Sequence, residues 1–161
     1  MKYLLIIMLF LTSCTYLTDD DLNSFVDAQL RNSKKGVLDF RNFKYKGWNK
    51  MYILTPHAAA AGFDDTLLKS EDEILGTGIS KSDSFFLIVL AKNTRVVRIA
   101  RFSPSGISKL AIMNDKFGFY PKSTAVFDYR TAGNLKRFNA KETEFKHFSS
   151  DWPGSVINNI K

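Results

Sequence analysis

The sequence predicts an α+β fold, a mainly antiparallel sheet of about five strands with an N-terminal helix and a second helix on one face. Apolar residues recur at helical spacing in two segments, one near the N-terminus and one within residues 64–75. Elsewhere, β-branched and aromatic runs are separated by turn residues, and two pairs of these runs have the pattern of hairpins. Hairpins join antiparallel strands, so the sheet is expected to be mainly antiparallel.

The first expected helix begins near Thr18. Thr18 can cap the helix, and the three aspartates after it fall in the first turn, where negative charge complements the helix dipole. Four apolar residues follow at helical spacing, namely Leu22, Phe25, Val26 and Leu30. Residues 34–36, Lys-Lys-Gly, are typical of a helix end. The three aspartates also suggest calcium, but they lack the alternating ligand positions and the glycine of a calcium loop.

After this helix the pattern changes to that of strands. Residues 37–42 alternate as a strand does, and residues 48–54 form an aromatic and β-branched run that Pro56 ends. Residues 64–75 have the spacing of a second helix, which Gly76 ends.

The clearest pattern in the chain lies within residues 85–102. Two apolar, β-rich runs, 85–90 and 96–102, flank a turn at Asn93, which can adopt a positive φ. They are predicted to be neighbouring antiparallel strands, central in the sheet. A second hairpin is expected from residues 124–130 and 135–138.

The N-terminus has the pattern of a lipoprotein signal peptide. Residues 1–13 hold one charge and an apolar run too short to span a bilayer. The tetrapeptide Leu-Thr-Ser-Cys at residues 11–14 resembles the lipobox of bacterial lipoproteins. Cys14 is the only cysteine of the chain, and a thioether bond to lipid would consume its thiol. We therefore expect a signal peptide over residues 1–13 and a single lipid-anchored domain over residues 14–161.

The same reading predicts a location in the cell envelope. Thr15 follows the expected lipidated cysteine, where an aspartate would favour the inner membrane. In a Gram-negative host we therefore expect the outer membrane, with the domain facing the periplasm. The net charge of +7 falls to +6 when Lys2 leaves with the signal peptide. For an exported protein, anionic phospholipid or lipopolysaccharide is a more natural counter-charge than nucleic acid. The charges form no single block in the sequence, so we expect a solvated basic surface.

The sequence shows few residues that suit catalysis, and we predict no enzyme, cofactor or metal site. The histidines, His57 and His147, lack the spacing of metal ligands, and His57 is expected to lie at the surface or to cap a helix. Residues 76–82 differ from a phosphate loop because no glycine precedes the lysine. Trp152, beside a turn, is expected to pack the C-terminal segment onto the core, with an exposed docking aromatic as the alternative.

One stretch, residues 48–57, resembles the W-D-x-x-Y-I-x-x-P-Y signature of small uncharacterised bacterial secreted lipoproteins, and the resemblance extends over residues 47–102. It implies an α+β fold and an exported role and assigns no site. This chain has Asn49 and His57 where those sequences have aspartate and tyrosine. The signature positions are Trp48, Tyr52 and Pro56. On a regular strand Trp48 and Tyr52 would share a face, which we expect to be core, with an aromatic docking surface as the alternative.

Two functional hypotheses follow from these observations. The first is a non-enzymatic envelope lipoprotein that is anchored through Cys14 and binds a protein or another envelope component. The second is an immunity-type inhibitor of an antibacterial toxin in the periplasm, for which an acidic toxin would suit the +6 charge. A hydrolase with a site that the sequence does not show is a weaker third.

Overall fold

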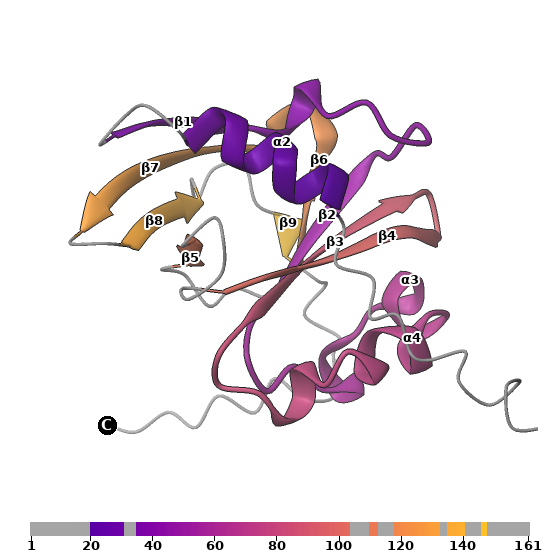
Figure 1. Cartoon of the computed structure of the whole chain (residues 1–161). Helices are drawn as coiled ribbons and strands as arrows, with labels where there is room; N and C mark the ends of the chain where they lie inside the picture. Colours follow the sequence, from indigo (N-terminus) through magenta and orange to yellow (C-terminus); the bar gives the residue numbers. More distant parts are fainter. Residues whose placement is uncertain are drawn as a thin grey trace, which may run out of the picture.

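The computed structural model shows an α+β fold with two sheets (Figure 1). Among the described residues, one sheet has five strands in the order β4-β3-β2-β6-β9, and the other has four in the order β1-β7-β8-β5. The predicted α+β class and the N-terminal helix are confirmed, whereas the second sheet was not predicted. The structure describes residues 20–30, 35–103, 110–112, 118–132, 135–140 and 146–147.

The bounds of the strands are β1 Lys35–Asp39, β2 Lys50–Leu54, β3 Phe86–Lys92, β4 Arg95–Phe102, β5 Leu110–Ile112, β6 Gly118–Pro121, β7 Val126–Ala132, β8 Leu135–Ala140 and β9 Lys146–His147. The α-helices are α2 Asp20–Leu30, α3 Asp65–Leu68 and α4 Glu71–Gly76. The short 3₁₀ helices in the described part of the chain are η2 Phe40–Asn42, η3 Ala60–Gly62, η4 Ile79–Lys81 and η5 Lys122–Thr124. Among the described strands, only β5 and β8 pair in parallel.

Both predicted hairpins are confirmed, but the prediction that the first lies centrally in the sheet is wrong, because β4 ends the described five-stranded sheet and only β3 is internal. Strands β3 and β4 pair antiparallel on either side of Asn93, whose φ of +57° is the left-handed conformation expected for the turn. A register shift between Leu90 and Ala91 adds a bulge close to the tip of this hairpin. Strands β7 and β8 form the second hairpin.

The five-stranded sheet has a hydrophobic core on each face. Ile88 and Leu90 of β3 belong to the first core, and Leu87 and Val89, on the opposite face of the same strand, belong to the second. Helix α2 covers the first core and the α3–α4 segment the second, so the helices lie on opposite faces of the sheet (Figure 1).

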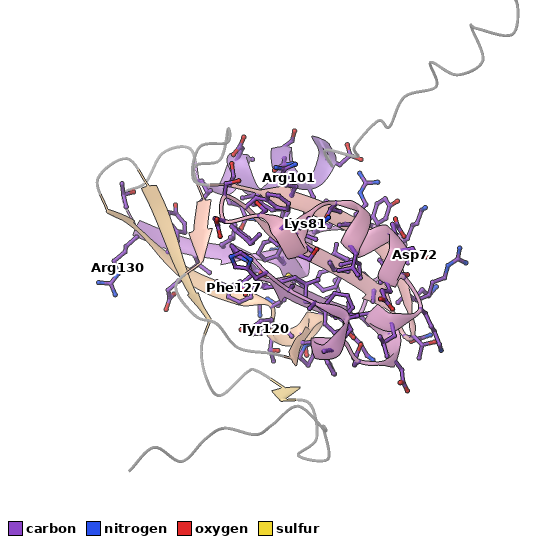
Figure 2. All side chains as sticks on the ribbon, turned by 90° about the horizontal axis from the view of Figure 1, so that it is seen from below. Asp72, Lys81, Arg101, Tyr120, Phe127 and Arg130 are labelled. Carbon is purple, nitrogen blue, oxygen red and sulfur yellow. The ribbon has the colours of Figure 1, made fainter. Side chains whose placement is uncertain are left out.

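The first core also joins the two sheets. Tyr120 of β6 and Phe127 of β7 meet edge to face with their ring centroids 5.0 Å apart (Figure 2). Phe127 also meets Phe40 edge to face at 5.8 Å. Aromatic pairs in this geometry add to the stability that comes from buried area alone.

Two expected elements differ in detail. The helix expected over residues 64–75 is divided into α3 and α4, and Asp64 caps α3 by accepting hydrogen bonds from the N–H groups of Thr66 and Leu67. The strand expected over residues 37–42 ends at Asp39. The Asp39 carboxylate accepts a hydrogen bond from the Arg41 N–H, and this contact caps η2. The chain therefore forms a 3₁₀ helix over residues 40–42 where the strand was expected to continue.

Several predictions concern residues that lie outside the described part of the chain. These are the signal peptide, the lipidation site Cys14, the Thr18 cap and the packing of Trp152. Of the helices that the structure describes, none is both long enough and apolar enough to cross a membrane.

A Val89→Asp substitution tests the two-sided burial of β3. Val89 is fully buried between Tyr52 and Ile99 on the neighbouring strands, so an unpaired carboxylate there should lower the unfolding free energy by about 4 kcal/mol or more. Val37→Asp on the exposed part of β1 is the control, with an expected change within about 0.5 kcal/mol. Urea unfolding of the mature chain measures both. A Val89→Asp variant as stable as the control would contradict the register of β3.

Candidate functional site

Trp48 and Tyr52 are both buried, as the core interpretation expects, but they lie on opposite faces of the sheet. Trp48 belongs to the first core and Tyr52 to the second. The prediction that they share a face is wrong because the regular strand begins only at Lys50. Trp48 lies ahead of it at the end of a turn, so strand alternation does not extend back to its side chain.

Trp48 is held by one hydrogen bond and by dense packing. Its indole Nε1 donates to the carbonyl oxygen of Phe43 over 2.9 Å, and the Lys122 ammonium lies 4.9 Å from the centre of the ring. The side chain is 1% exposed. These contacts give the residue a structural role in the first core.

Tyr52 connects the sheet to the helical segment that covers it. Its hydroxyl donates to Asp64 Oδ2 over 2.9 Å, while Asp64 Oδ1 caps α3. Burial raises the pKa of Tyr52 above its usual value, and the nearby Asp64 carboxylate acts in the same direction. Tyr52 therefore stays protonated and remains a hydrogen-bond donor across the physiological range.

Pro56 and His57 follow the end of β2, as the sequence predicts. His57 has a φ of +65°, and its Nε2 lies 2.5 Å from Asp83 Oδ1. Both side chains are largely exposed, which matches the surface interpretation of His57. No serine, threonine or cysteine of the described residues hydrogen-bonds to the imidazole. The same part of the chain has no cluster of three potential metal ligands.

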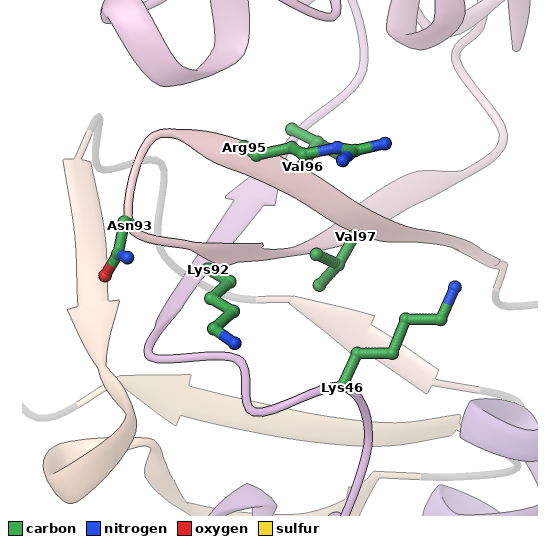
Figure 3. Close-up of a pocket in the computed structure, with 6 residues that line it drawn as sticks. All are labelled: Lys46, Lys92, Asn93, Arg95, Val96 and Val97. Carbon is green, nitrogen blue, oxygen red and sulfur yellow. The ribbon is translucent and has the colours of Figure 1, made fainter.

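The feature that stands out chemically is a cleft at the tip of the β3–β4 hairpin (Figure 3). It has a volume of about 380 Å³ and is called the cationic cleft here. The residues that line it are Lys46, Lys92, Asn93, Arg95, Val96 and Val97. Three of the six carry a positive charge and none carries a negative one.

One wall of the cleft is a tight turn ahead of Trp48. The Trp48 N–H donates to the Tyr45 carbonyl oxygen over 3.2 Å, which closes the turn. Both central residues have positive φ, +39° for Lys46 and +62° for Gly47, as in a type I′ turn. A side chain at Gly47 would be strained in this conformation, and the turn leaves Lys46 exposed at its corner.

A reciprocal pair of asparagines joins this wall to the hairpin. Asn49 Oδ1 accepts from the Asn93 N–H over 2.8 Å, and Asn49 Nδ2 donates to Asn93 Oδ1 over 2.9 Å. The Asn49 N–H also donates to the carbonyl oxygen of Ala91. Asn49, where the resembling sequences have aspartate, therefore fixes Lys46 relative to Lys92 by holding the two turns together.

The electrostatics of the cleft are those of an anion site. Within the described ranges, Lys46, Lys92 and Arg95 form no ion pair with a carboxylate, and all three are exposed. Arg98 lies next to the cleft with its guanidinium 4.4 Å from the centre of the Tyr45 ring. The aliphatic surface of Val97 adds an apolar patch between the charges.

A second hollow, of about 300 Å³, lies where α3 meets α4 and has the opposite charge. Its carboxylates are Glu71, Asp72 and Glu73 in the first turn of α4. Acidic residues in that position stabilise a helix through its dipole, which accounts for them without a ligand. The cationic cleft is therefore the stronger candidate for function.

Comparisons of the chain with protein-family models, with curated proteins and with solved structures found no significant match. The resemblance of residues 47–102 to secreted lipoproteins therefore stays a prediction.

The cationic cleft was not identified from the sequence, although part of its signal lies there. Lys92 and Arg95 flank the predicted turn at Asn93, and this pair of charges was visible in the sequence. Lys46 joins them only because Asn49 binds Asn93, a contact between residues 44 positions apart.

A Trp48→Ala substitution tests the structural role of this side chain. Loss of a buried tryptophan should lower the unfolding free energy of the mature chain by about 3–5 kcal/mol. Trp48→Phe keeps most of the ring packing and loses the bond to Phe43, so its effect should be smaller. Thermal and urea unfolding give both values. If Trp48→Ala melted like the wild type, burial in the first core could not be the role of Trp48.

An Asn49→Ala substitution tests the link between the two turns. Removing both side-chain hydrogen bonds should lower the unfolding free energy by about 1–2 kcal/mol and speed hydrogen exchange at the Asn93 N–H. Asn49→Asp is the matched control, because a carboxylate can still accept the bond from Asn93. Equal exchange at Asn93 in the wild type and in Asn49→Ala would show that the pair does not hold the hairpin.

Proposed function

We propose that this chain is a non-enzymatic binding domain of the bacterial cell envelope, anchored by lipid on Cys14, which binds an anionic partner through the cationic cleft. The observation that supports the proposal is the grouping of Lys46, Lys92 and Arg95 around one cleft without a carboxylate. Like charges repel, so a group of exposed cations without counter-charges gains most from an external anion.

The chemistry of the lining residues favours binding over catalysis. The polar residues that line the cleft are two lysines, one arginine and one asparagine, and the other two are valines. Lysine and arginine donate charge-assisted hydrogen bonds to carboxylate and phosphate oxygens. The same surface would serve an inhibitor of an acidic toxin, which is the second candidate function.

Lipidation is tested first. Full-length wild-type protein expressed with a palmitate analogue should carry the label and fractionate with membranes, because the diacylglycerol is bonded to the Cys14 sulfur. A Cys14→Ala variant should carry none. Equal labelling of the two proteins would exclude the proposed anchor.

Partner binding is tested with two triple variants of equal charge. The cleft variant is Lys46→Gln, Lys92→Gln and Arg95→Gln, and the control variant is Lys69→Gln, Lys81→Gln and Arg130→Gln. The control residues are exposed and do not line the cleft, and Lys81 and Arg130 are labelled in Figure 2. Cross-linking in intact cells should give the same adducts for wild type and control, and the cleft variant should lose them. Identical adducts from all three proteins would show that the cleft is not the binding surface.

A further inference from the structure

We propose that the anionic partner of the cationic cleft is the membrane itself, namely the phosphate-bearing head groups of anionic phospholipids beside the lipid anchor. This inference rests on the proposed function, because it requires the anchor at Cys14. It assigns the cleft a particular ligand and gives the domain a defined orientation on the membrane.

A chain of side-chain contacts places the cleft next to the start of α2. Asp21, in the first turn of α2, accepts a hydrogen bond from Arg98 Nη2 over 3.3 Å. The Arg98 guanidinium stacks on Tyr45, and the Lys46 ammonium lies 5.2 Å from the centre of the same ring. Figure 1 shows that α2 begins on the side of the molecule where the β3–β4 hairpin turns.

The tether to the membrane is short. Five residues, 15–19, separate Cys14 from the start of α2 at Asp20. At about 3.3–3.6 Å per residue, the six steps from Cys14 to Asp20 place the first residue of the helix no more than about 22 Å from the lipidated cysteine. A domain of this size is roughly 40 Å across, as its expected radius of gyration implies. The tether is thus shorter than the domain, and the surface around the start of α2 stays near the membrane.

The arrangement of the charges suits several head groups better than one small anion. Figure 3 shows Lys46, Lys92 and Val97 on one side of β4, whereas Arg95 extends along the other side. Cations that diverge in this way suit several phosphates better than a single one. They can each reach a different phosphate of a charged surface, and each contributes about fivefold to affinity at such a surface. Three cations together would contribute roughly 100-fold.

Two further groups at the cleft fit a phospholipid. Asn93 uses its side-chain oxygen and its backbone N–H in the bonds to Asn49, and its Nδ2 bonds to no described residue. That amide remains available to donate to a phosphate oxygen. Val97 lies between Lys46 and Lys92 and offers an apolar contact to the glycerol end of the acyl chains (Figure 3).

The experiment uses lipidated protein purified from membranes and reconstituted into vesicles. One vesicle preparation is phosphatidylcholine alone, and the other contains one-third phosphatidylglycerol. A neutral amine-reactive reagent then labels lysines, and mass spectrometry gives the extent of labelling at each. We expect Lys46 and Lys92 to be protected at least threefold in the phosphatidylglycerol vesicles, relative to Lys69 and Lys81 in the same molecules. The protection should disappear in 1 M salt, where the screening length falls to about 3 Å.

Three results would overturn the inference. The first is equal labelling of Lys46 and Lys92 in the two kinds of vesicle. The second is protection in phosphatidylcholine vesicles on addition of soluble glycerol phosphate, which would identify a small soluble ligand. The third is equal protection by an acidic peptide, which would favour a protein partner. The intact mass of the protein distinguishes failure of this inference from failure of the proposed function. Protein without lipid on Cys14 refutes both. Lipidated protein whose cleft lysines are not protected refutes only this inference.

The two triple variants give an independent readout in the same vesicles. Backbone hydrogen exchange in segments 45–49 and 92–97 should slow severalfold on phosphatidylglycerol for the wild type and for the control variant. The cleft variant should show no slowing, although its exchange in phosphatidylcholine vesicles should equal that of the wild type. Slowing that persists in the cleft variant would mean that these cations do not contact the lipid.

Discussion

Strand β3 is apolar on both faces from Phe86 to Ala91, and neither face can be left to water. One face needs α2 and the strands of the second sheet to complete the first core, and the other needs the segment that contains α3, α4 and η4. The elements that cover the two faces of the five-stranded sheet are therefore needed to bury the apolar side chains of β3. Tyr52 and Trp48 follow from the same constraint, since each completes the core on one side of the sheet. Burial of apolar surface on this scale is the main contribution to stability in a domain without disulfides.

The sequence predicted those elements whose pattern is local. The 85–102 hairpin was recognisable because a continuous apolar run predicts a strand buried on both faces and Asn93 supplies the turn. The pairing of β1 with β7 was not recognisable, because these strands are about 90 residues apart and no periodicity within either one specifies its partner. Trp48 was placed on the wrong face for a local reason: the turn at Lys46 and Gly47 delays the start of β2.

The candidate site divides in the same way. Lys92 and Arg95 are close in sequence and in space, so a basic hairpin tip was predictable from residues 92–95 alone. Lys46 reaches this region because Asn49, three residues along the chain, bonds to Asn93 at the hairpin turn. Asp21 reaches it by accepting a hydrogen bond from Arg98 of β4. No spacing in the sequence signals either contact. The signature residues Trp48 and Tyr52 are accounted for by packing and by one hydrogen bond each. The aromatic signature, which suggested a docking surface, thus has a structural role. The charged residues of the cationic cleft, which suit partner binding, belong to no sequence motif.

Strand β4 lies at the edge of the five-stranded sheet, where a strand of another molecule could pair with it. Among the described strands it pairs only with β3, which leaves one edge of its backbone without a strand partner. Arginines stand at every third position of this strand, Arg95, Arg98 and Arg101. Charged side chains on an edge strand oppose pairing with the same edge of another molecule. If the domain is anchored as proposed, it meets other copies on the membrane far more often than in free solution, and these arginines oppose the sheet-to-sheet aggregation that a neutral β4 would allow.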